Sequence, residues 1–192
     1  MNWVLASICI LALGFWGFTY HQSKKLEQPT YTVLASEHDF ELREYAPSLW
    51  AEVQVDEANY SAMRKGFQPL ARYIFGGNQS QTSMEMTAPV SLIMEESAPT
   101  MRFFMSAKMT VDKLPLPNDA RVHFVEEPSR RLAVYRFGGI LSEDKRLAAG
   151  QKLKQWCDAQ GYDITGPVEV YGYNAPYEII RRNEVAYPIA SN

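Results

Sequence analysis

One predicted helix carries residue types that could bind a ligand. Met63, Phe67, Leu70 and Ile74 recur at spacings of four, three and four residues, which predicts an apolar stripe on a helix. Arg64, Gln68 and Arg72 form a polar row beside that stripe. Arginine pairs well with carboxylates, because its planar guanidinium offers several fixed donors. The helix therefore offers an apolar surface beside two cations, although the same pattern also fits a core helix with a solvated arginine row.

No motif in the sequence indicates catalysis. The sequence has no His/Cys cluster with zinc spacing, no phosphate-binding glycine motif and no nucleophile elbow. Glu85 and Glu169 could act as pocket carboxylates if their side chains point inward. Cys157 lies in a predicted helix and is interpreted as a buried packing residue. We therefore expect a binding protein and not an enzyme.

Composition is that of an ordinary globular protein. The chain has 192 residues, 46% of them hydrophobic, with a net charge of -3. This charge balance argues against a dedicated nucleic-acid surface. Only two cysteines are present, Cys9 in an apolar run and Cys157, so we expect no intramolecular disulfide.

The N-terminal segment predicts a membrane anchor. Residues 3–20 contain no charged side chain, and 18 helical residues would span roughly 27 Å, enough to cross a bilayer core. Aromatic Trp3, Trp16 and Tyr20 lie near its ends, as expected at membrane interfaces. These features predict a single-pass anchor at residues 1–21, and the alternative is a cleaved signal peptide. Lys24 and Lys25 follow the segment and only weakly favour a cytoplasmic globular part.

A polar linker (residues 22–30) is followed by one predicted domain, residues 31–190. The second predicted helix begins after Ser142, a good N-cap, and ends at Gly161. The first helix is expected to end at Gly76 or Gly77 and to be kinked or split by Pro69. Residues with alternating or continuous apolar character predict strands at 31–34, 40–45, 49–55, 84–94, 102–106, 122–126, 132–137, 168–173, 177–180 and 185–189.

The two halves of this domain have the same order of elements. Each has strands, a helix with a glycine stop, a strand that opens with Pro-Val, and a further strand; the Pro-Val pairs are Pro89-Val90 and Pro167-Val168. This order predicts a duplicated β-α-β-β unit. Two such units can join into one distorted β-barrel with both helices packed outside, an α+β fold. Chance similarity of two α+β halves is the alternative.

Several separated motifs resemble the SOUL haem-binding protein family. They are residues 41–45 (ELREY), 76–78 (GGN), 86–90 (MTAPV), 172–176 (GYNAP) and 181–185 (RRNEV). The likeness covers about Tyr31 to Ile189, and the family fold agrees with the predicted repeat. The resemblance implies non-covalent, reversible binding of haem or another tetrapyrrole. It also implies that the face of the first helix is the haem platform, formed by Arg64, Phe67, Leu70, Ala71, Arg72 and Ile74, with the two arginines near the propionates.

An axial ligand to the haem iron is not identified. His21 lies in the membrane flank, His38 in a predicted turn and His123 on a strand. Some family members that this chain resembles have a histidine at the position of Glu44, which is a poor ligand for haem iron. Met63, Met84 and Met86 could bind iron through sulfur, but such methionines usually serve packing.

The first functional hypothesis is a haem or tetrapyrrole carrier or buffer at a membrane. A second is a module that binds another amphipathic small molecule, of the GyrI-like effector-binding type, because fold does not fix function. A third is an enzyme that uses Glu169 or Tyr171, which the lack of a catalytic set disfavours. The fourth is a protein-interaction module that uses the loop from Asn78 to Ser83.

Overall fold

The computed structural model describes residues 26–191 except 56–59, 96–97, 175–177 and 179. These residues form one nine-stranded antiparallel sheet with two α-helices and a short 3-10 helix. The elements are β1 (Tyr31–Glu37), β2 (Phe40–Tyr45), β3 (Ser48–Gln54), α2 (Tyr60–Ile74), β4 (Val90–Ile93), β5 (Thr100–Phe104), η1 (Val111–Lys113), β6 (His123–Glu127), β7 (Arg130–Gly138), α3 (Glu143–Gln160), β8 (Glu169–Gly172) and β9 (Arg182–Ile189).

The strand order is the same in both halves of the sheet. From edge to edge it runs β1-β2-β7-β9-β8-β4-β5-β3-β6. Replacing β2, β3, β4 and β5 by β6, β7, β8 and β9 converts one half of this order into the other, read from the opposite edge. The first strand of each repeat pairs with a strand of the other repeat: β2 pairs with β7, and β6 pairs with β3.

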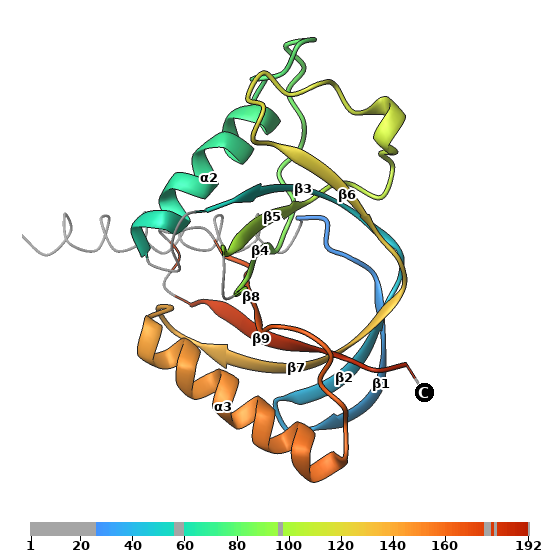
Figure 1. The fold of residues 1–192 in the computed structure, drawn as a ribbon, viewed down its shortest axis with the longest axis vertical. Coiled ribbons are helices and arrows are strands. Elements are labelled where there is room, and N and C mark those ends of the chain that lie inside the picture. Colours follow the sequence, from blue (N-terminus) through green and yellow to red (C-terminus); the bar gives the residue numbers. More distant parts are fainter. Residues whose placement is uncertain (1–25, 56–59, 96–97, 175–177, 179, 192) are drawn as a thin grey trace, which may run out of the picture.

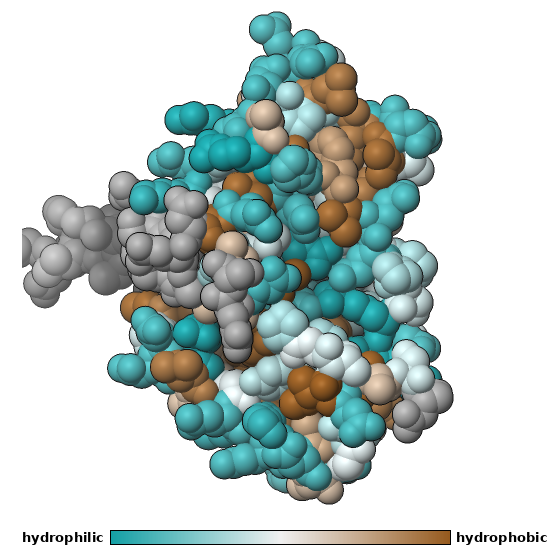
Figure 2. Space-filling model, viewed as in Figure 1, coloured by the Kyte–Doolittle hydropathy of each residue, from teal (hydrophilic) through white to brown (hydrophobic). Residues whose placement is uncertain are grey.

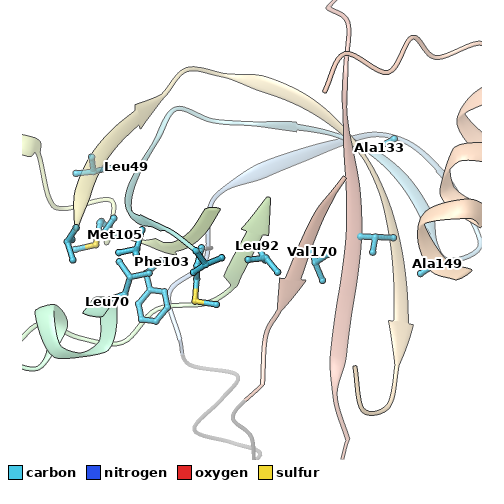
Figure 3. Packing of buried hydrophobic residues seen from close by; sticks show 14 of the residues in the cluster. Leu49, Leu70, Leu92, Phe103, Met105, Ala133, Ala149 and Val170 are labelled. Carbon is cyan, nitrogen blue, oxygen red and sulfur yellow. The ribbon is translucent and has the colours of Figure 1, made fainter. Parts of the chain in front are cut away.

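The sheet curls into a half-barrel, as Figure 1 shows. Its edges, β1 and β6, do not pair with each other among the described residues, so the predicted barrel stays open. Both helices pack on the same face of this sheet, α2 against β3 and β5 and α3 against β7 and β9. Residues from the strands and both helices meet there in one apolar core, which Figure 3 shows from Leu49 across to Ala149.

Local signals set the ends of the helices. The Ser142 hydroxyl caps α3 by accepting a hydrogen bond from the Lys145 N–H at 3.3 Å, and Gly161 ends the helix with φ 72°. After α2, Gly76 takes φ 96°, a left-handed conformation that costs glycine little. Pro69 lies inside α2, which continues as one element through it and is not split there.

Three strand predictions are corrected by the structure. In the strand expected over residues 177–180, the described residues Glu178 and Ile180 belong to no strand. The strand expected over residues 84–94 is only β4, because Pro89 has no N–H to donate to a ladder and residues before it instead form isolated bridges with residues outside the named strands. One of these bridges joins Thr87 to Glu27. At the other end of the chain, Arg182–Glu184 does not interrupt a strand but begins β9, and Glu184 is buried.

The predicted membrane anchor at residues 1–21 lies outside the described residues. Within the described residues, neither helix is long and apolar enough to cross a membrane. Residues 26–30, which we assigned to the linker, contact the sheet. Leu26 packs beside a buried aromatic cluster, and the Glu27 carbonyl accepts a hydrogen bond from the Ala88 N–H at 2.9 Å.

Candidate functional site

The six residues predicted as a ligand platform lie on two different faces of α2. Leu70 and Ile74 are 0% and 1% exposed and point into the core between α2 and the sheet. Figure 3 shows Leu70 turned toward Phe103 on β5. These two side chains therefore stabilise the fold by apolar burial and offer no open surface in this structure.

The outer face of α2 carries the accessible part of the predicted platform. Phe67 is 38% exposed, with its ring centroid 5.2 Å from that of Phe103, which fixes one side of it. Ala71 is half-buried and Arg72 is exposed. Arg64 belongs to α2, but its side chain lies outside the described residues. Phe67 and Ala71 are one helical turn apart, so they form a short apolar row beside Arg72.

Phe75 was not among the residues predicted for the α2 platform, but it extends the outer row. Phe75 follows the last residue of α2, lies four residues after Ala71 and is 64% exposed, so it continues the outer row. Its backbone pairs with Ser83, which holds the loop of residues 76–83 beside the end of the helix. An apolar residue four positions after Ala71 was the available signal, because helical neighbours recur at that spacing.

The face of the sheet opposite the helices carries a buried ionic network. The Glu184 carboxylate is 0% exposed and lies 2.8 Å from the guanidinium nitrogens of both Arg43 and Arg182. The Tyr173 hydroxyl also donates a hydrogen bond to this carboxylate, at 2.8 Å. Burial alone would raise the pKa of Glu184, but the hydrogen bonds and charges of Arg43 and Arg182 outweigh burial and hold it at about 2.

A second network includes one of the two predicted pocket carboxylates. Glu169 is buried and accepts hydrogen bonds from Arg130 at 2.9 Å and from the Tyr171 hydroxyl at 2.5 Å, whereas Glu85 is exposed. Burial, together with the Glu169 charge, raises the pKa of Tyr171 well above its ordinary value, so Tyr171 is a neutral donor. Arg130 also pairs with Glu127 at 3.1 Å.

A narrow cavity adjoins these networks. It measures about 10 Å³ and is lined by aromatic rings such as Tyr45 and Trp50 together with Arg130. A volume near 10 Å³ accommodates about one water molecule, so this space does not accept a larger ligand as it stands. Gln28 and Pro29, from the segment before β1, form one wall.

A larger cavity lies at one end of the sheet and measures about 550 Å³. Four segments line it: Pro29–Thr30, the β2–β3 turn (residues 46–49), the end of β5 with the segment after it (residues 104–110), and the β6–β7 turn (residues 126–128). No residue of α2 is among them. In Figure 2 apolar side chains gather at the upper right, over the segment that contains η1, which continues from this lining.

The described residues supply no evident ligand for haem iron. His38 lies in a turn with φ 54° and is exposed, and His123 is exposed on edge strand β6. Met84 and Met86 are half-buried and pack against the apolar core, while His21 and the Met63 side chain lie outside the described residues. No group of three or more His, Cys, Asp or Glu that could hold a metal occurs in the described part of the chain.

Comparison with known proteins identifies the family. The sequence pattern of the family described as "SOUL heme-binding protein" matches residues 26–188. The chain belongs to the SOUL heme-binding protein family. The SOUL match begins at Leu26, so it includes the segment before β1 that packs against the sheet.

Curated relatives of this SOUL protein agree with the family match. "Heme-binding protein 2" of Homo sapiens is 28% identical over 168 residues, covering 80% of this chain and 78% of that protein. "Heme-binding protein 1" of Xenopus tropicalis is 28% identical over 162 residues, covering 76% of this chain and 81% of that protein.

Solved structures show the same fold at low sequence identity. The C-terminal domain of EcmrR superposes with a TM-score of 0.59 at 14% identity, covering 84% of this chain and 99% of that chain. An uncharacterized conserved protein from Listeria innocua superposes with a TM-score of 0.60 at 13% identity, covering 81% of this chain and 94% of that chain. At such identities the likeness establishes the fold and no function.

Proposed function

We propose that this SOUL protein binds haem or a related tetrapyrrole without a covalent bond and acts as its carrier or buffer. The observation that carries the proposal is the family match over residues 26–188. The proposal includes no catalytic step and assigns no residue as ligand to the iron. Attachment to a membrane through residues 1–21 is a separate part of the proposal, which does not assign the side of the membrane on which the domain lies.

The outer face of α2 is the proposed site. Phe67, Ala71 and Phe75 would contact the flat apolar ring, because they form a row at helical spacing and two of them are large and exposed. Arg72 would pair with a propionate, and Arg64, two turns earlier, would serve the second. Of the predicted residues, Leu70 and Ile74 would act by holding α2 against the sheet.

Haem titration of the full chain tests the proposal. The chain is placed in lipid nanodiscs, and the Soret band is compared with that of empty nanodiscs, because haem also enters lipid. Phe75→Ala and Arg72→Ala should each weaken binding about tenfold, the value of roughly 1.4 kcal/mol expected for lost apolar contact or a charge-assisted hydrogen bond. The matched controls Ile140→Ala and Arg131→Ala remove comparable side chains elsewhere and should leave the haem affinity unchanged.

The outcomes separate the parts of this proposal. A saturable Soret shift with one haem per chain that survives both site changes would refute the α2 site while keeping haem as the ligand. The absence of a saturable shift would refute tetrapyrrole binding. A binding module for another amphipathic molecule would then be the stronger proposal.

A further inference from the structure

The end cavity differs in chemistry from the α2 face. Its walls are mainly apolar, with Leu49, Phe104 and Met109 beside several prolines. Ser48 and Thr110 add hydroxyl groups. The volume of about 550 Å³ falls in the range of roughly 300 to 1,000 Å³ usual for small-molecule sites, which are mostly apolar with a few polar groups.

Every charged group that lines the cavity is negative. Glu126 and Glu127 are the only charged side chains among the described residues that form its walls, and neither Lys nor Arg is present there. The negative charge of Glu127 is offset by ion pairs with Arg102 at 3.2 Å and Arg130 at 3.1 Å. Glu126 is exposed and forms no ion pair within the described part of the chain. Its carboxylate therefore leaves the cavity with a net negative character.

We propose that this cavity is a second binding site, for an apolar small molecule that carries no negative charge. An uncharged or singly cationic aromatic compound would bury its rings against Phe104 and Met109 and direct its polar group to the hydroxyls and to Glu126. A dianionic tetrapyrrole would place its propionates beside carboxylates, and like charges repel. This site is therefore distinct in ligand and place from the one on α2.

Two hydrogen bonds hold segments of the cavity wall in place. The Ala46 N–H donates to the Thr30 carbonyl at 3.0 Å, which ties the β2–β3 turn to the segment before β1. On the other side, the Ala107 N–H donates to the Glu27 carboxylate at 2.7 Å. The first bond joins two segments of the wall, and the second ties Ala107 to the segment before β1. Segments held in this way lose less conformational freedom when a ligand binds, which lowers the entropic cost of binding.

Three naphthalene compounds of nearly equal size test the charge preference. They are 1-naphthalenemethanol, which is neutral, 1-naphthylmethylamine, which is cationic at neutral pH, and 1-naphthoate, which is anionic. Binding to the full chain in nanodiscs is followed through the amide NMR shifts of Ser48 and Ala107. We expect saturable shifts with the first two compounds and at least about tenfold weaker binding of 1-naphthoate, because of Glu126.

Substitutions then locate the site. Ala107→Trp places an indole in the cavity from an exposed turn and should abolish binding of 1-naphthalenemethanol, followed through the Ser48 amide. Ala120→Trp, the same change at an exposed alanine outside the cavity, should leave binding intact. Glu126→Lys should strengthen binding of 1-naphthoate about tenfold, because an attractive charge replaces a repulsive one.

Three results would overturn this inference. They are the absence of saturable shifts with the neutral and cationic compounds, equal binding of 1-naphthoate, and retained binding in the Ala107→Trp variant. Haem titration of the Ala107→Trp variant distinguishes the two proposals, because its haem affinity should equal that of the unsubstituted chain. Loss of the Soret shift in that variant would place haem in the end cavity and refute the separation of the two sites.

Discussion

Glu184 should control much of the acid stability of this protein. Its pKa is lowered from 4.5 to about 2, and each unit of difference between the folded and unfolded chain is worth about 1.4 kcal/mol, so its ionised form contributes about 3 kcal/mol. The pKa is lower in the folded state. This stability is therefore fully present above pH 4.5 and is lost as the pH falls through about 2.

Glu184→Gln keeps the shape of the side chain and removes its charge. We expect the free energy of unfolding to fall by about 3 kcal/mol at pH 7, because Arg43 stays buried without its main partner. Glu41, 2.6 Å from Arg43, keeps the loss from being larger. The gap between variant and unsubstituted chain should narrow as the pH is lowered from 5 toward 2, because Glu184 then becomes protonated in the latter.

Urea unfolding at a series of pH values measures this gap. Glu44→Gln is the matched control, since Glu44 is 45% exposed and pairs with Arg131 at 3.4 Å, an exposed ion pair worth about 1 kcal/mol or less. A loss below about 1 kcal/mol for Glu184→Gln at pH 7, or a gap that does not change with pH, would refute the reasoning.

Three further predictions concern other parts of the chain. Burial raises the pKa of Cys157 to about 11, so iodoacetamide at pH 8 should label it slowly in the folded protein and rapidly in denaturant, as read by peptide mass spectrometry; equal rates would contradict this. Gly77→Ala should destabilise the fold by about 1–3 kcal/mol in urea unfolding, because the new Cβ would lie 2.6 Å from the Arg72 carbonyl oxygen, whereas Gly172→Ala meets no atom within 4 Å and should cost less. Residues 1–21 should keep the full chain in the membrane pellet after carbonate extraction, and a chain released into the supernatant would refute the anchor.

Much of the fold followed from local signals in the sequence. Ser142 and Gly161 mark the ends of α3, because capping depends on residues adjacent in the chain. The start of β9 at Arg182 shows the limit of such signals. A run of charged and polar residues predicted an interruption, yet Glu184 is buried because Arg43, 141 positions away in sequence, neutralises it. A partner at that separation cannot be found from local pattern.

The candidate site shows the same limit on α2. Helical spacing placed Phe67, Leu70 and Ile74 in one apolar stripe, but it cannot say which part of a stripe the sheet covers. The structure buries Leu70 and Ile74 and leaves Phe67 on the outer face with Phe75. The end cavity had no signal in the sequence, since its walls come from four segments that are separated along the chain.

The buried networks explain why we place the two proposed sites on α2 and in the end cavity and not on the face of the sheet opposite the helices. Arg130 and Glu169 already pair with each other there, and only about one water fits in the space above them. A ligand carboxylate that took Arg130 would leave Glu169 charged, buried and without its partner, at a cost of several kcal/mol. The outer face of α2 and the end cavity require no such exchange, because Arg72 and Glu126 are already exposed to solvent. In the two proposals made above, the opposite charges of Arg72 and Glu126 therefore direct carboxylate-bearing ligands to α2 and other apolar ligands to the end cavity.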